Sequence, residues 1–559
     1  MQELHAKKVP LRSPSQVMKL SRMGSAHAHR LSFMRILMRR MQRENWRIEA
    51  TEFVIDGNGV GHAVYTAHTP NRTYSLVAFS HDLPAELRSD RVIAEAWDCT
   101  FTLFDGIPTP EDVKRLSQNV PHQEAGRISK SELSLSRANR SVRLWAHVVE
   151  RLANGLQPDP QMINDVGYLM RTTAVYGSGK FGAADRQDIA DRAEFAAPFQ
   201  SEMLSVYLTR TFVMDLVEHI ARAKGGEKAV VLDPVMRRQF GIGNSTGLGM
   251  APFILNHPIL LNNWVASKEE ALSRVRTLSK FNATDQQRFT NLVIRADLNW
   301  QLWHSEHPLQ LEKLAALRMD LDALLDFLAS GPAVSWDAIY CWAEGNLSEE
   351  GCELVVSLLI ESHPEFVDEL SDCMSADETL DFRIRGEVKV GDVLAQIEQI
   401  YGWAKSLNWE EENHNARVWY VSEEKLEPRL GERFQEDEIA QYEQPLSPLR
   451  DVYRLAACLE NENENGTIAE VLLTHPEHRH AARRVQIAAK YPYAEIRDNT
   501  ICAEMLPIDM LRFKLSFFGA KHFDPRSDRW VRINMFAGAP YPQDLVDTAD
   551  DWFFPPLPS

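Results

Sequence analysis

The chain has 559 residues, of which 44% are hydrophobic and 25% charged, which is typical of a globular protein with several domains. No segment is apolar over the length of a transmembrane helix, and the six cysteines form no C-x-x-C pair. We therefore expect no membrane span and no disulfide framework, and we place the protein in the cytoplasm. The net charge of −18 argues against binding to nucleic acid, which is a polyanion.

The first predicted unit, residues 1–45, is a basic arm that ends in a helix. Residues 1–50 contain eleven Lys and Arg against three Asp and Glu, so they carry +8 and the rest of the chain −26. Prolines predict a flexible lead over residues 1–24, and apolar residues at helical spacing among arginines predict an amphipathic helix over 26–45. We expect its apolar face to pack on the protein's own core and the arm to clasp a neighbouring subunit of a homo-oligomer. Docking on an anionic partner is the alternative.

The second unit, residues 46–133, is predicted to be an antiparallel β-rich domain. Apolar and polar residues alternate between Trp46 and Ala78, and Asp56-Gly57-Asn58-Gly59 is typical of a hairpin turn. The third unit, residues 134–330, is predicted to be all-helical, and the fourth, residues 331–559, to be a mixed α/β region. The fold class that follows is α+β, with an N-terminal antiparallel sheet, a large central all-helical domain and a mixed C-terminal region.

Helical spacing predicts the elements of the third unit and several of the fourth. Prolines near several of the predicted starts support helix N-termini there. The predicted helices cover residues 141–154, 160–172, 198–224, 252–264, 268–279, 286–303, 310–330, 349–372 and 390–407. The predicted strands of the fourth unit cover residues 380–388, 416–421, 512–517 and 530–535.

The stretch Gly241–Phe253 has four glycines and three capping residues directly before an apolar run. This pattern predicts a helix N-terminus that holds a carboxylate or phosphate, because backbone amides, hydroxyl groups and the positive end of the helix point at one anion. His257, one turn into that helix, is a catalytic candidate. A packing corner between two helices, which needs small residues, is the alternative. The predicted substrate ligands are Gly243, Asn244, Ser245, Thr246 and Gly247.

A second glycine-rich element, residues 171–182, adds cations and a phenol. Lys180 and Tyr176 are the predicted catalytic pair, because an ammonium and a phenol close together can transfer protons. Arg171, near the end of a predicted helix, is expected to clamp a substrate carboxylate, and Ser178 to bind the same substrate. In the alternative, Gly177 ends a helix and Lys180 lies in solvent.

We expect neither a metal nor a bound cofactor. His304 with His307, and the group His475, His478 and His480, lack the H-E-x-x-H spacing, and arginines beside the second group disfavour a dication. A C-terminal basic cluster, interleaved with aromatic residues, is expected to pair with the acidic body or with a subunit partner rather than with a nucleotide or single-stranded nucleic acid. Its members are Arg512, Lys514, Lys521, His522, Arg526, Arg529 and Arg532.

These features favour a cytoplasmic, homo-oligomeric enzyme that acts on a small carboxylate or phosphate by lyase-type or proton-transfer chemistry, with the anion at a helix N-terminus. Residues 177–181 and 243–246 are expected to line one pocket of the helical domain. Two other classes stay open. One is a non-catalytic interaction or regulatory protein that binds an anionic partner through the basic arm and the C-terminal basic cluster. The other is a cofactor-dependent oxidoreductase.

Overall fold

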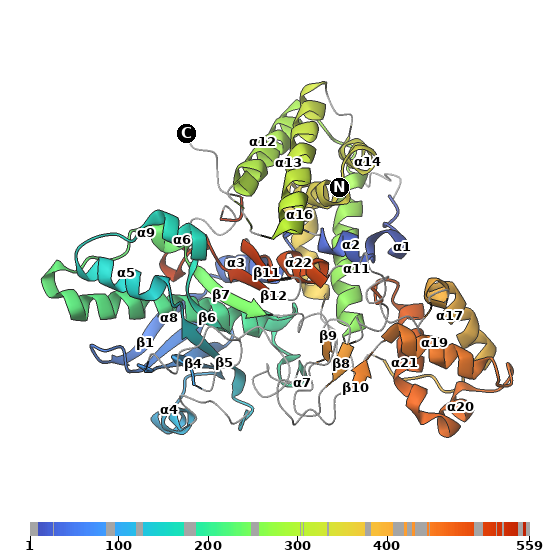
Figure 1. Ribbon diagram of the computed structural model, residues 1–559, viewed down its shortest axis with the longest axis horizontal. Coiled ribbons are helices and arrows are strands. Elements are labelled where there is room, and N and C mark those ends of the chain that lie inside the picture. Colours follow the sequence, from blue (N-terminus) through green and yellow to red (C-terminus); the bar gives the residue numbers. More distant parts are fainter. Residues whose placement is uncertain are drawn as a thin grey trace.

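A computed structural model of the protein is built around a nine-stranded sheet with helices packed on it and beside it (Figure 1). It describes residues 9–25, 27–84, 96–118, 127–172, 186–246, 257–301, 303, 305, 307–331, 335–374, 382–405, 408, 419–421, 428–430, 444–446, 448–496, 507–520, 522–527, 530–545 and 552–554.

The main sheet joins strands from both ends of the chain in the order β1-β2-β3-β4-β5-β6-β7-β12-β11. Neighbouring strands are antiparallel except β6 and β7, which run parallel. The bounds are β1 Arg47–Ile55, β2 Gly61–His68, β3 Thr73–Ser80, β4 Cys99–Asp105, β5 Glu132–Arg140, β6 Tyr168–Thr172, β7 Gly241–Thr246, β11 His522–Ser527 and β12 Trp530–Met535. A small sheet has the order β10-β8-β9, with β8 Trp419–Val421, β9 Pro428–Leu430 and β10 Gln444–Leu446.

The hairpin of β1 and β2 forms where the sequence predicts it. Ile55 pairs with Gly61, and the Asp56 carboxylate accepts hydrogen bonds from the amides of Asn58 and Val60, both at 2.9 Å. Gly59 has a φ of +83°, which glycine adopts without strain. The α+β class is confirmed, with a mostly antiparallel N-terminal sheet and a mixed C-terminal region. The central region is rich in helices but not all-helical as predicted, because β5, β6 and β7 lie in it and pair within the main sheet.

Helices build most of the remaining structure and largely follow the predicted ranges. Segments 252–264 and 268–279 contribute to a single helix, α11, because no glycine or proline separates them.

Among the described helices, none combines the length and the apolar character that a bilayer span requires. The bounds are α1 Pro14–Val17, α2 Leu20–Gly24, α3 Phe33–Arg43, α4 Pro110–Ser117, α5 Leu144–Ala153, α6 Pro160–Val166, α7 Arg186–Ile189, η3 Ala193–Phe195, α8 Gln200–Gly225, η4 Gly226–Lys228, α9 Pro234–Gln239, α11 Pro258–Thr277, α12 Ala283–Gln301, α13 Pro308–Ala329, α14 Trp336–Asn346, α15 Glu349–Glu361, α16 Pro364–Val367, η5 Asp368–Cys373, α17 Val390–Lys405, α19 Pro448–Leu459, α20 Ile468–Thr474, η6 Pro476–His478, α21 Arg479–Lys490, α22 Pro507–Phe518 and η7 Pro542–Asp544.

Helix α8 packs against the main sheet and is buried along most of its length. Its Arg210 is buried, and the guanidinium donates hydrogen bonds to the carbonyl oxygens of Phe240 at 2.7 Å and Ala539 at 2.9 Å. The same guanidinium lies 3.9 Å from the centre of the Tyr541 ring. Arg210 therefore ties α8 to the entry of β7 and to the turn that follows β12.

The basic arm is folded into the molecule. Residues 9–24 are not the predicted flexible lead, because α1 and α2 lie there and Arg12 and Arg22 are buried. The apolar side chains of α3 enter the main core as predicted, but Arg35 and Arg40 of the same helix are buried too. The flexible lead was predicted from prolines, and this prediction was wrong over residues 9–24 because a local pattern does not reveal the carboxylates that pair with Arg12 and Arg22 inside the fold.

Several elements differ from the prediction. Gly167, with a φ of +72°, ends α6 early, so β6 replaces the second half of the predicted helix 160–172. Segment 512–517 lies in α22 rather than in a strand, because Phe513 and Phe517, four residues apart, are buried together on one helical face. Described residues 382–388 form no strand, whereas 530–535 is β12 as predicted.

Two hydrophobic cores organise the packing. The main core takes residues from Val17 through to Phe554, and so from all four predicted units. A second core lies within residues 390–488 and is built by α17, α19, α20 and α21, the group of helices at the lower right of Figure 1. Packing therefore marks off this C-terminal group of helices, while the predicted domain boundaries stay a prediction.

Gly243→Ala tests the close contact between β6 and β7. A Cβ atom on Gly243 would lie 2.7 to 2.8 Å from ring carbons of Tyr168, so the ring or the strand has to move. We expect the free energy of unfolding to fall by about 1 to 3 kcal/mol, seen as a lower urea midpoint. The control is Gly345→Ala in α14, where a Cβ atom has no neighbour within 4 Å and alanine favours the helix by about 1 kcal/mol. Equal midpoints for the two variants would contradict the tight packing.

Candidate functional site

The predicted anion-binding element is a strand in the structure. Residues 241–246 form β7, which lies between β6 and β12, so they do not form the predicted helix N-terminus. A strand in this position uses its backbone amides and carbonyls to pair with its neighbours rather than to hold an anion. The correction concerns Gly243, Asn244, Ser245 and Thr246, while Gly247 lies outside the described residues.

Close packing explains the glycines of β7. The Tyr168 ring of β6 occupies the space above Gly243, and Asn534 of β12 leaves no room for a Cβ atom on Gly241. Asn244 is 1% exposed, and its Nδ2 donates a hydrogen bond to the Thr172 carbonyl oxygen at 3.2 Å. Gly241 and Gly243 therefore have a packing role, but between strands, so the alternative of a packing corner between two helices is wrong.

The other candidates are placed as follows. Arg171 is buried in β6 and is not near the end of a helix, because α6 ends before Gly167. His257 directly precedes Pro258, the first residue of α11, and so lies at the N-cap rather than one turn into the helix. Tyr176, Ser178 and Lys180 lie outside the described residues.

The segments that follow β6 and β7 nevertheless start from the same end of the main sheet. Strands β6 and β7 are parallel neighbours, and Thr172 and Thr246 are their last residues. The segment after Thr172 contains Tyr176 to Lys180, and the segment after Thr246 begins with Gly247. In open α/β sheets, ligands bind outside the carboxyl ends of the parallel strands, and β6 and β7, the one parallel pair among the described strands of this mostly antiparallel sheet, present two such ends side by side. We refer to the carboxyl ends of β6 and β7, at this end of the sheet, as the β6–β7 edge.

Two arginines lie on one face of the sheet at the β6–β7 edge. Arg171 pairs in register with Gly243, which pairs with Asn534 of β12. Two residues nearer the edge, Ser245 pairs with Arg532. Because side chains alternate along a strand, Arg532 and Asn534 share a face, and register places Arg171 on the same face. Arg532 belongs to the C-terminal basic cluster, and the hairpin of β11 and β12 carries it to this edge.

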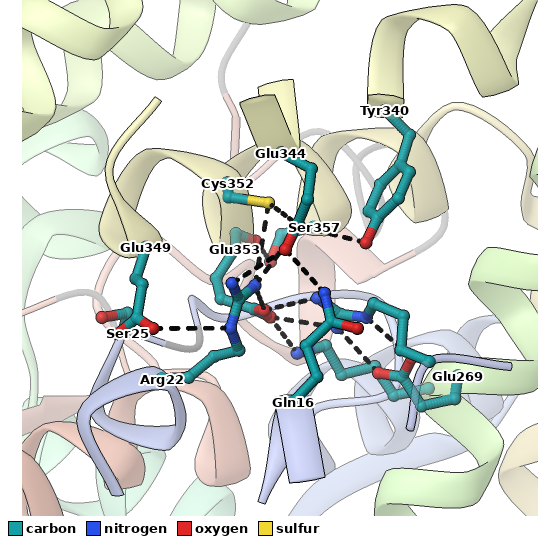
Figure 2. Close-up of polar contacts among 12 residues, drawn as sticks. Gln16, Arg22, Ser25, Glu269, Tyr340, Glu344, Glu349, Cys352, Glu353 and Ser357 are labelled. Carbon is teal, nitrogen blue, oxygen red and sulfur yellow. Dashed lines mark hydrogen bonds and ion pairs between the residues drawn. The ribbon is translucent and has the colours of Figure 1, made fainter. Parts of the chain in front are cut away.

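A buried ion-pair network joins the basic arm to α11, α14 and α15 (Figure 2). Arg12 pairs with Glu269 at 2.8 Å and with Glu353 at 2.6 Å. Glu353 also accepts hydrogen bonds from Arg22 at 2.9 Å and from Lys268 at 2.6 Å. Burial alone raises the pKa of Glu353, but the charges of Arg12 and Lys268 outweigh that effect and hold the pKa well below its ordinary value.

Every cation of the network is paired with carboxylates of the same chain, which indicates a structural role. Arg22 also pairs with Glu344 at 3.0 Å and lies 4.0 Å from the exposed Glu349, so three cations face four carboxylates. The Cys352 thiol donates to Glu344 at 2.8 Å, and burial followed by the neighbouring carboxylates raises the pKa of this thiol strongly. A thiol held in its neutral form is a poor nucleophile. No sequence pattern indicated the network, because its members are separated by up to 341 residues.

A cavity of about 480 Å³ opens between α12, α14 and the end of α15. Three guanidinium groups line it. Arg30 forms ion pairs with Asp368 at 2.8 Å and with Glu361 at 3.1 Å, and the exposed Arg288 pairs with Asp285. The buried Nε1 of Trp336 has no hydrogen-bond partner among the described residues. The cavity lining consists of Arg30, Arg288, Phe289, Asn291, Leu292, Arg295, Trp336, Glu361, Ser362, Pro364, Glu365 and Phe554.

No family model, no curated protein and no solved structure matches this chain. Functional inference therefore depends on the chain's own residues and on the arrangement of the β6–β7 edge.

Glu353→Gln tests the buried network. The substitution leaves Arg12, Arg22 and Lys268 with one buried negative charge fewer, and breaking a buried ion pair costs about 3 to 5 kcal/mol. We expect a large fall in the thermal midpoint. The control is Glu349→Gln, because the Glu349 side chain is 46% exposed and lies 4.0 Å from Arg22; exposed pairs contribute at most about 1 kcal/mol. Similar midpoints for both variants would show that Glu353 does not hold the network together.

Acid should weaken the attachment of the basic arm. Burial raises the pKa of Glu361, but Arg35, at 2.5 Å, and Arg30 outweigh it and lower the pKa to about 2. A lowered native pKa stabilises the fold above the ordinary value of 4.5, and this stabilisation is lost as the pH falls toward about 2. Urea midpoints measured across this range should therefore fall less steeply in Glu361→Gln than in the wild type. Parallel profiles would contradict the assignment.

Proposed function

We propose that the protein is an enzyme that binds a small carboxylate or phosphate at the β6–β7 edge. The observation that carries this proposal is the parallel pairing of β6 and β7, which starts both glycine-rich segments from one edge of the main sheet. Open α/β sheets bind ligands at the corresponding position, outside the carboxyl ends of their parallel strands. The site differs from the helix N-terminus expected from the sequence, but the class of ligand is the same.

Positive charge supports an anionic ligand at this edge. Arg171 and Arg532 lie on either side of β7 on one face of the sheet, and an arginine binds carboxylates and phosphates through paired hydrogen bonds. Lys180 and Tyr176, in the segment that follows β6, are the proposed proton-transfer residues, and Ser178 is a proposed ligand of the substrate. The chemistry we propose is of the lyase or proton-transfer type.

The rival class, an interaction protein that binds an anionic partner through its basic arm, has weaker support. Arg12, Arg22, Arg30, Arg35 and Arg40 all pair with carboxylates of the same chain. Arg512 of the C-terminal basic cluster is also buried and pairs with Glu350. Such arginines are neutralised inside the fold and offer little charge to a partner.

The compartment and the assembly remain part of the proposal. The five described cysteines form no disulfide, which supports a reducing compartment such as the cytoplasm. A homo-oligomer is proposed as expected from the sequence. A cofactor-dependent oxidoreductase stays the second alternative, and an absorbance spectrum of the purified protein tests it for flavin.

Ligand-induced thermal shift over a panel of small carboxylates and phosphates, followed by turnover assays on each hit, tests the proposal. We expect Arg532→Met, at a half-buried position, and Arg171→Met each to weaken binding by about tenfold to a hundredfold, the equivalent of about 1.5 to 3 kcal/mol for a hydrogen bond to a charged group. Lys180→Met should abolish turnover while binding persists.

Arg288→Met is the matched control, because it removes an arginine from the 480 Å³ cavity and leaves the β6–β7 edge intact. This variant should bind the panel as the wild type does. If Arg288→Met loses the shift and the Arg171 and Arg532 variants keep it, the anion binds in the cavity and the proposed site is wrong. If no compound shifts the melting temperature of the wild type, the proposal of an anion-binding enzyme fails.

A further inference from the structure

Three side chains with metal-binding atoms meet in the C-terminal group of helices. Cys458 lies in the last turn of α19, Glu462 lies in the loop that follows, and His475 lies where α20 ends and η6 begins. The thiol sulfur, a carboxylate oxygen and an imidazole nitrogen all lie within 4.8 Å of one another. Thiolate, imidazole and carboxylate together form a ligand set typical of Zn²⁺.

The imidazole of His475 is oriented as in a metal ligand. Its Nε2 lies 3.8 Å from Oε1 of Glu462, on the side of the cluster, and its Nδ1 lies 3.4 Å from Oε1 of Glu477. Histidines that bind a metal through one ring nitrogen usually donate the proton of the other to a carboxylate, which fixes the ring and its tautomer. Glu477 occupies that second position.

The electrostatics of the cluster also favour a cation. The Glu462 carboxylate lies within 4.8 Å of both the Cys458 sulfur and a His475 ring nitrogen, and the Glu477 carboxylate lies 3.4 Å from Nδ1 of the same ring. Two carboxylates and a thiol thus converge without a lysine or arginine paired to Glu462 or Glu477 among the described residues. Of the three arginines that the sequence places beside this histidine group, Arg484 pairs with Glu495 at 2.7 Å, so its charge is neutralised inside the fold.

We propose that Cys458, Glu462 and His475 bind one Zn²⁺ ion, with a water molecule as the fourth ligand. Binding forms a zinc–sulfur bond and releases the thiol proton to solvent. The side chains of Glu462 and His475 are 38% and 36% exposed, so the ion and its water have access from solvent. The ion links the end of α19 to the end of α20 and so stabilises the second core. This inference is independent of the proposed anion site and replaces the expectation that the chain binds no metal.

The full chain, stripped of metal by a chelator, provides the test. We expect it to bind one equivalent of Zn²⁺ in competition with a chromophoric chelator, and excess Mg²⁺ not to displace the ion, because Mg²⁺ prefers an all-oxygen site. Co²⁺, used as a spectroscopic substitute, should give tetrahedral d–d bands and a thiolate charge-transfer band. Zn²⁺ should also raise the thermal midpoint.

Variants identify the ligands. Cys458→Ser should lose the charge-transfer band and His475→Gln most of the Zn²⁺ affinity, while Glu477→Gln should weaken binding by about 10- to 100-fold, as expected for a residue that orients a ligand. Cys341→Ser, at an exposed cysteine of α14, and His480→Gln, at a histidine paired with Asp451, are the controls and should bind as the wild type does. Circular dichroism checks that each variant is folded.

The proposal is overturned if the wild type binds no Zn²⁺ against the chelator. It is equally overturned if Cys458→Ser keeps the charge-transfer band, or if Cys341→Ser loses it, because the thiolate ligand then lies elsewhere in the chain.

Discussion

The packing of the basic arm against α11 and α15 depends on the buried Glu353 carboxylate. An ion this far from solvent is tolerated only when opposite charges and hydrogen bonds surround it, and Arg12, Arg22 and Lys268 supply both. Two of these cations come from the basic arm and one from α11, so the arm covers this part of α15. The arm is therefore an integral part of the helical layer and not an appendage.

The same pairing continues along the arm. Arg30 and Arg35 pair with Glu361, and Arg40 pairs with Asp372, so the positive segment and the acidic body neutralise one another from α1 to α3. At the other end of the chain, Arg512 of α22 donates to the Gly24 carbonyl oxygen at 3.1 Å and pairs with Glu350. The positive and negative segments of the sequence thus pair with each other inside the fold. These ion pairs hold both ends of the chain against α15.

The proposed site lies on the main sheet, which combines strands from distant parts of the chain. Strands β1 to β5 form a continuous antiparallel meander, whereas β7 reaches its parallel place beside β6 only after α8 has crossed the sheet. The hairpin of β11 and β12 then completes the far side of β7 and adds Arg532. The resulting edge gathers residues from three distant segments. The proposed zinc cluster depends on a different arrangement, the meeting of two helix ends within the second core.

The sequence by itself determined the elements whose signals are local. The alternation from Trp46 to Ala78 and the turn at Asp56 predicted the first hairpin, and helical spacing predicted α5, α8, α12, α13 and α17 close to their observed bounds. Tertiary structure alone decided that Gly241–Thr246 is a strand. Its two glycines are needed because the side chains of Tyr168 and Asn534, which lie elsewhere in the chain, pack directly against them. It also decided that Arg12 meets Glu353 and that Cys458 meets His475. The neutralisation of a buried charge, the packing of a ring on a glycine and the proposed metal site all depend on residues that are near in space but separated in the sequence. A pattern along the chain reports only on neighbours in sequence.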